Sequence, residues 1–103
     1  MKQQDLEAVM GLITYGGNAK SEAMEAIQAA KVGDFALADK KIKAAEDSLA
    51  EAHRAQTNML TEEAKGNHTE ITLLSVHGQD HLMNAITFTD LAKEILEIYK
   101  KMD

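Results

Sequence analysis

The stretch KVGDF, residues 31–35, decides the fold of this chain. Gly33 stands where a helix would end, because glycine readily adopts the left-handed backbone conformation of a helix C-terminus. Asp34 follows at a position where its side chain can accept hydrogen bonds from the first backbone N–H groups of a new helix. The stretch therefore predicts a tight turn between two helices.

A second break, KGNHTE at residues 65–70, repeats this arrangement. Gly66 and Asn67 serve as helix stop signals, and Thr69 is the expected cap of the next helix. Three long helices joined by two short connections predict an antiparallel up-down-up bundle. The expected helices span about residues 3–32, 34–65 and 69–101 of one domain, residues 1–103.

The composition agrees with an all-α fold. Proline is absent, and alanine, glutamate, lysine, leucine and methionine are abundant. These residues favour helices, whereas strands favour β-branched and aromatic residues. At 103 residues the core of the single domain is limited, so oligomerisation would add stability.

Charge and cysteine content exclude several classes of function. Seventeen acidic and eleven basic residues give a net charge of −6, which argues against nucleic acid and anionic membranes as partners. The chain has no cysteine, so a disulfide framework and a cysteine-based zinc site are impossible. No apolar run is long enough to insert into a membrane, and the N-terminus has no signal-peptide pattern. We expect a cytoplasmic protein.

The first two segments carry apolar stripes at helical spacing. Two adjacent glycines, Gly16 and Gly17, interrupt the first stripe at a cost of about 2 kcal/mol relative to alanine. We expect close approach of another backbone or of a phosphate there; a kink is the alternative. The stripes comprise Leu6, Val9, Met10, Ile13, Met24 and Ile27 in the first segment, and Leu37, Ile42, Ala45, Leu49, Ala52, Gln56, Met59 and Leu60 in the second.

The third segment is apolar on more than one side. One set, Leu74, Gly78, Leu82, Ala85, Ala92 and Leu96, clusters on one face of the predicted helix. A second set, Val76, Met83, Leu91 and Ile98, lies well away from that face. A three-helix bundle covers only one face of each helix, so another partner is needed. The simplest partner is a second copy, and we expect the third helix to line an oligomer axis.

Four polar residues lie within this third segment, in SVHGQDHLMNAI at residues 75–86. His77, Asp80, His81 and Asn84 are spaced so that they are neighbours on one side of a helix. They could be hydrogen-bonded structural residues, or His77, His81 and Asp80 could bind a metal, although the glutamate of H-E-x-x-H is missing. Alternatively, a histidine could carry a phosphoryl group, with Gln79 or Asp80 near enough in sequence to hold its ring. A histidine-phosphotransfer domain is a further interpretation, although such domains usually have four helices.

Four stretches together resemble one known family. VHGQDHLM at 76–83, EAHRAQTNML at 51–60, GDFALAD at 33–39 and GGNAKS at 16–21 are similar to the lactose/cellobiose-specific IIA component of the bacterial phosphoenolpyruvate-dependent sugar phosphotransferase system. The resemblance runs in order over about residues 4–100. Gly78 stands where alanine is also common in the family, and we expect this difference to be harmless.

The resemblance implies a fold, an activity and partners. The family fold is a three-helix bundle that assembles as a homotrimer of nine helices. His77 matches the nucleophile that accepts a phosphoryl group from the phosphocarrier HPr. The group then passes to a cysteine of the IIB component, upstream of the IIC permease, for uptake of a β-linked disaccharide of the lactose, cellobiose or chitobiose type. The chain is thus expected to be a phosphotransferase component.

The resemblance also implies a metal site. Asp80 matches a residue at the trimer axis, where one carboxylate from each subunit would bind one Mg²⁺ or similar divalent cation. Around His77, we expect Gln79 to orient the ring. The expected supporting residues are His81, Gly17 and Gln56.

Overall fold

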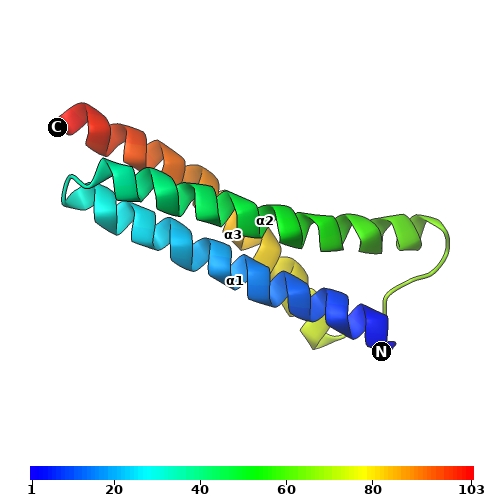
Figure 1. Cartoon of the computed structure of the whole chain (residues 1–103). Coiled ribbons are helices and arrows are strands. Elements are labelled where there is room, and N and C mark those ends of the chain that lie inside the picture. The colour runs from blue at the N-terminus through cyan, green and yellow to red at the C-terminus, as the bar shows by residue number, and fades with distance from the viewer.

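The computed structural model describes all residues 1–103 and contains three helices and no strand. The helices are α1 (Gln3–Lys31), α2 (Phe35–Ala64) and α3 (Leu73–Met102). Figure 1 shows that α2 runs antiparallel to both α1 and α3, in a rod of 52 × 19 × 18 Å. The predicted all-α, up-down-up architecture is confirmed. None of the three helices is long and apolar enough to cross a membrane.

The turn between α1 and α2 has the predicted chemistry. Gly33 has φ +80°, a conformation in which a side chain would be strained. The Asp34 carboxylate accepts a hydrogen bond from the backbone N–H of Leu37 at 3.1 Å. Both residues therefore act as expected at the end of α1 and the start of α2.

The connection between α2 and α3 differs from the prediction. Gly66 has φ +92° after the end of α2, as expected. However, α3 begins at Leu73, and the prediction of Thr69 as its cap is wrong. Thr72 is the cap: its Oγ1 accepts from the Ser75 N–H at 3.1 Å, and Ser75 Oγ accepts from the Thr72 N–H at 2.8 Å. This reciprocal pair satisfies two backbone donors at once, so it sets the start of the helix.

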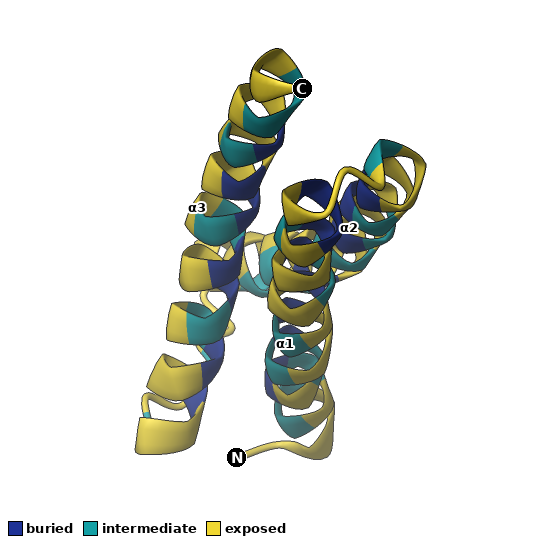
Figure 2. Ribbon diagram, turned by 90° about the vertical axis from the view of Figure 1, so that its left-hand side faces the viewer, coloured by how far each residue is buried: buried dark blue, intermediate teal, exposed yellow.

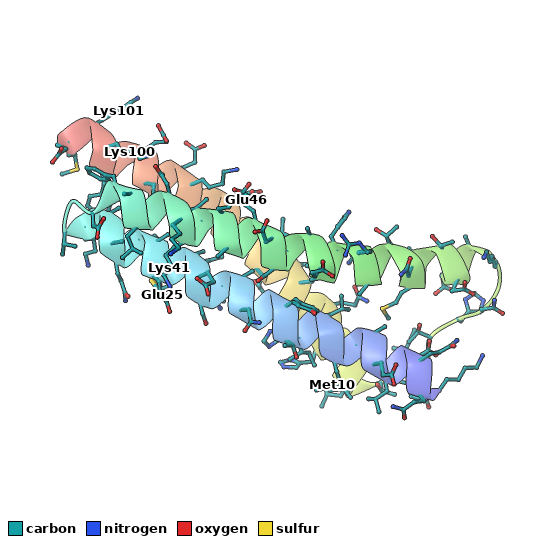
Figure 3. The ribbon with its side chains drawn as sticks, in the orientation of Figure 1. Met10, Glu25, Lys41, Glu46, Lys100 and Lys101 are labelled. Atoms are coloured by element: carbon teal, nitrogen blue, oxygen red, sulfur yellow. The ribbon has the colours of Figure 1, made fainter.

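Alanine dominates the core between α1 and its neighbours. Met10 and Met24, expected in the buried stripe of α1, are instead 45% and 43% exposed (Figure 3 labels Met10). The prediction for these two residues is wrong because small side chains allow the helices to approach closely and leave no room for a methionine layer. The buried residues of α1 are Val9, Leu12, Gly16, Ala19, Ala23, Ala26, Ala29 and Ala30.

Helix α3 has two apolar sets, as predicted. One set packs in the core and includes Gly78, Leu82, Ala85, Ala92 and Leu96. The prediction of Leu74 as a member of this set is wrong, because its side chain is 38% exposed in the first turn of the helix. In the second set, Leu91 and Ile98 are each 57% exposed, and Val76 and Met83 are exposed as well. Figure 2 shows exposed residues along the outward side of α3 and buried residues along its inner side. One chain alone leaves this apolar stripe uncovered.

Ion pairs link the helices on the solvent side. Lys41 of α2 lies 2.6 Å from Glu25 and 3.5 Å from Glu22, both on α1 (Figure 3 labels Lys41 and Glu25). The hydrogen bond to Glu25 raises the pKa of Lys41. On the other side of α2, Lys100 of α3 lies 2.8 Å from Asp39. Exposed pairs of this kind contribute little to stability. Their positions agree with the faces that neighbouring helices turn toward each other.

Candidate functional site

Two histidines lie on one flank of α3, close to its N-terminus. His77 and His81 are one helical turn apart, and their ring centroids are 4.4 Å apart with an interplanar angle of 78°. This edge-to-face arrangement is a favourable geometry for a pair of rings. The imidazole of His77 is exposed, whereas His81 is half-buried. A partner can therefore reach His77 without any rearrangement of the chain.

Gln79 lies on the opposite flank of α3, because two residues turn a helix by about 200°. Its Oε1 accepts a hydrogen bond from Gln56 Nε2 at 2.9 Å, and its Nε2 lies 3.8 Å from the sulfur of Met59. Gln56 Nε2 also lies 3.9 Å from the sulfur of Met83. Within one chain Gln79 makes no hydrogen bond to His77. The predicted supporting residue Gln56 thus donates a hydrogen bond to Gln79, and this bond connects α2 to α3.

Asp80 lies between these two flanks, on the uncovered stripe. Its carboxylate is exposed, and Oδ1 accepts a hydrogen bond from Asn84 Nδ2 at 2.9 Å. The same Nδ2 donates to the backbone carbonyl of Asp80 at 3.0 Å. The sequence placed Asp80 and Asn84 side by side, and their spacing of four residues on a helix explains this bond.

A metal site within a single chain is not found. No group of three histidine, aspartate or glutamate side chains is placed to hold a metal ion. The hypothesis that His77, His81 and Asp80 together bind a metal is therefore wrong for one chain. A site made of one Asp80 from each of three copies is a different arrangement, which a single chain does not test.

The two glycines of α1 have different surroundings. A Cβ atom on Gly16 would lie 3.3 Å from the carbonyl oxygen of His81 and 3.5 Å from the backbone nitrogen of Leu82. The expected close approach of a second backbone is thus confirmed at Gly16. A Cβ atom on Gly17 would have no heavy atom within 4 Å, so the supporting role of Gly17 stays a prediction.

Gly78 is a second point of close approach between α1 and α3. A Cβ atom there would lie 3.0 Å from Val9 Cγ1 and 3.3 Å from the Val9 carbonyl oxygen. Gly16 and Gly78 thus allow α1 and α3 to approach closely at the two ends of the turn that carries both histidines, Gly78 next to His77 and Gly16 opposite His81. The sequence predicted the close approach at Gly16 but not its partner at His81, and it did not predict the contact at Gly78, because spacing alone does not tell which residue of another helix lies opposite a glycine.

These features define a class: a three-helix chain that presents an exposed imidazole at a fixed position on its third helix. The family described as "PTS system, Lactose/Cellobiose specific IIA subunit" matches residues 7–100. The match covers most of the chain, which therefore belongs to this family of the phosphotransferase system.

Individual relatives agree with this assignment. The chain is 49% identical over 102 residues to the lichenan-specific phosphotransferase enzyme IIA component of Bacillus subtilis, covering 99% of this chain and 93% of the relative. The crystal structure of the PTS cellobiose-specific enzyme IIA from Bacillus anthracis superposes with a TM-score of 0.94 at 46% identity, covering 99% of this chain and 94% of that one. The IIA(chitobiose) chain of a complex with HPr, from Escherichia coli, superposes with a TM-score of 0.82 at 35% identity, covering 99% and 98%.

Proposed function

We propose that this chain is a cytoplasmic phosphocarrier in which His77 accepts a phosphoryl group from phospho-HPr and transfers it to a cysteine of a IIB component. The exposed imidazole of His77, on a flank of α3 that no other helix covers, carries this proposal. The solved complex of a relative with HPr supports the choice of donor.

The chemistry is two successive phosphoryl transfers. In the first, a ring nitrogen of neutral His77 attacks the phosphorus, an N–P bond forms, and the N–P bond to the donor histidine breaks. In the second, a cysteine thiolate attacks the same phosphorus, an S–P bond forms, and His77 leaves as imidazole. Such transfers pass through a loose transition state that needs positioning more than acid–base catalysis. An exposed histidine on a rigid helix suits this requirement.

The sugar would be a β-linked disaccharide taken up through a IIC permease. The names of the relatives include lichenan, lactose, cellobiose and chitobiose systems. The carrier itself would contact only the phosphoryl donor and acceptor. The residues of the carrier therefore determine which proteins it binds, and they make no contact with the sugar.

We also propose a homotrimer around the exposed stripe of α3. Apolar side chains such as Leu91 and Ile98 would be covered by the same stripe of two other copies. In such an assembly one flank of each α3 faces the opposite flank of the next. Gln79 would then orient the His77 ring of a neighbouring copy, since it cannot reach His77 of its own chain.

The trimer would bring three Asp80 carboxylates together. Hard oxygen ligands suit Mg²⁺ or a similar divalent ion, and the exposed Asp80 carboxylate fits this donor type. The cation would neutralise the mutual repulsion of the carboxylates. Its role would be assembly, because the phosphoryl transfers described above use only His77 and its partners.

The test is phosphorylation of the purified chain by phosphoenolpyruvate, the general kinase of the system and HPr. We expect one phosphoryl group per chain, lost in acid as for phosphohistidine, and no label in His77→Gln. His81→Gln and His53→Gln are matched controls that should still be labelled. Labelling of His77→Gln would assign the nucleophile to another histidine and refute the proposal.

A further inference from the structure

Asn84 has no role in the proposed phosphoryl transfers, although it is a close neighbour of Asp80 on α3. It is exposed, and at about 100° per residue it lies about 40° from Asp80, one turn further along the helix. Leu91 and Ile98 lie within about 20° of Asp80, on the exposed side of α3 in Figure 2. Asn84 and Asp80 are therefore polar neighbours within the stripe that the proposed homotrimer would cover.

Two hydrogen bonds fix the side-chain amide of Asn84. Its Nδ2 donates to the backbone carbonyl of Asp80 at 3.0 Å and to the Asp80 carboxylate Oδ1 at 2.9 Å. A carbonyl and an ionised carboxylate only accept hydrogen bonds, so the nitrogen of the amide must face them. The backbone carbonyl belongs to the rigid helix and anchors the donor. The position of Oδ1 relative to the helix is thus set by Asn84.

Asp80 retains one free carboxylate oxygen. Oδ1 accepts from Asn84, whereas Oδ2 has no hydrogen-bond partner within the chain. In water this bond constrains the carboxylate weakly, because water competes for both groups. Cover by other copies would remove that competition, since a polar group without a partner is costly away from water. Asp80 would then offer a cation one oxygen, Oδ2.

The number of oxygens that each carboxylate offers affects which cation fits best. Ca²⁺ takes roughly six to eight oxygen ligands and readily binds both oxygens of one carboxylate. Mg²⁺ requires a near-ideal octahedron and keeps several of its waters. A set of carboxylates that each present a single oxygen, with water completing the shell, therefore suits Mg²⁺ better than Ca²⁺.

We propose that Asn84 is a positioning residue of the cation site: it holds Asp80 Oδ1, leaves Oδ2 as the only ligand oxygen, and so makes the site prefer Mg²⁺ to Ca²⁺. The inference rests on the proposed homotrimer with its axial cation, and it adds the residue that sets the choice of ion. Asn84 acts through Asp80 and does not itself bind the cation.

Titration of the cation-free chain with Mg²⁺ or with Ca²⁺ tests this role, with sedimentation recording the fraction of trimer. We expect the parent to assemble at a lower concentration of Mg²⁺ than of Ca²⁺. In Asn84→Ala the Mg²⁺ midpoint should rise roughly ten-fold, as is usual when a residue that orients a metal ligand is removed, and the Ca²⁺ midpoint should rise less. Asn84→Gln can still donate to a carboxylate one turn away, so it should restore most of the preference.

Thr87→Ala is the matched control, because Thr87 is also exposed and lies about 20° from Asp80 around the helix. Its two midpoints should shift by the same factor. Circular dichroism of each variant checks that the helices are intact.

The remaining outcomes overturn the inference. Equal shifts for both cations in Asn84→Ala, or loss of the trimer with both, would assign Asn84 to packing alone. A parent that prefers Ca²⁺ would exclude the single-oxygen arrangement. A parent whose assembly responds to neither cation would remove the proposed axial cation as well. His77 labelling of the same samples separates these results from the phosphocarrier function, which stands if the parent is still labelled.

Discussion

Replacing Gly16 and Gly17 separately by alanine tests the packing of α1 on α3. Both substitutions remove the conformational cost of a glycine within a helix, about 1 kcal/mol. The Cβ atom of Gly17→Ala meets nothing within 4 Å, so this variant should be more stable by about 0.5–1 kcal/mol. The Cβ atom of Gly16→Ala meets the carbonyl oxygen and carbon of His81 at 3.3 and 3.4 Å.

Backbone atoms within a helix cannot turn aside as a side chain can, so α1 and α3 must separate by a few tenths of an ångström. Overpacking of this kind costs about 1–3 kcal/mol, which exceeds the gain in helix propensity. Gly16→Ala should therefore be less stable than the parent by about 1 kcal/mol, and less stable than Gly17→Ala by about 2 kcal/mol. The gap in Tm should be on the order of 10 °C.

Urea unfolding followed by circular dichroism measures this difference at one fixed chain concentration, because the proposed assembly would also contribute to stability. Equal stabilisation by both alanines would refute the close contact between α1 and the backbone at His81.

A third variant, Gly17→Leu, tests the role of Gly17 in transfer. It should slow the labelling of His77 more than it lowers Tm if a partner uses the space at Gly17; normal labelling with a lower Tm would restrict Gly17 to packing.

Three further predictions concern other parts of the chain. The hydroxyl of Thr89 is buried and has no hydrogen-bond partner. Thr89→Val should therefore raise the free energy of unfolding by about 1 kcal/mol, and a lower urea midpoint would contradict this. Asp80→Leu should keep or strengthen the proposed trimer and remove the dependence on divalent cations that we expect of the parent, as sedimentation with and without chelator would show; a monomer under all conditions would exclude the axial role of Asp80. The Asn67 side chain donates a hydrogen bond to Glu62 and is the main cause of the lowered pKa of that carboxyl, so Asn67→Ala should raise the pKa toward the ordinary glutamate value in an NMR titration. Because the pKa is lowered by folding, the stabilising contribution of this contact is present at neutral pH and is lost as the pH falls through the lowered pKa; an unchanged pKa in the variant would exclude the amide as its cause.

The helix ends show which helix starts and stops can be predicted from single residues. Gly33, Asp34 and Gly66 act through their own backbone or side chain, so each could be identified from its residue type. The start of α3 could not, because two threonines were available and only Thr72 has Ser75 three residues later to complete the reciprocal bond. A cap that depends on two side chains is harder to find than one that depends on a single residue.

The core of α1 shows a different limit. Helical spacing identified one apolar stripe on this helix, made of larger side chains that include Met10 and Met24. The structure buries the alanines instead, among them Ala19 and Ala23. Periodicity gives the angle of a stripe but not the distance to the next helix, and that distance decides whether alanine or methionine fits.

In the site, spacing correctly placed His77 and His81 on one flank, because both belong to one rigid helix. It did not identify the partners of Gln79, since these lie on α2 and depend on how two helices are rotated relative to each other. The bond between Gln56 and Gln79 is a tertiary contact of this kind. A resemblance could mark both glutamines as belonging to the site without saying that they bind each other.

The segment His77–His81 meets four separate requirements in five residues. Successive residues of a helix point about 100° apart, so the five residues of this segment lie on all sides of α3. His77 and His81 occupy the exposed flank, Gly78 contacts Val9 in the core, Gln79 binds Gln56 of α2, and Asp80 lies on the uncovered stripe. Insertion of one residue within the segment would rotate everything after it by about 100° relative to everything before. The two histidines would then leave their common flank, and the glycine contact and the stripe could no longer be satisfied together. The order of these residues is therefore as necessary to the proposed site as their chemistry.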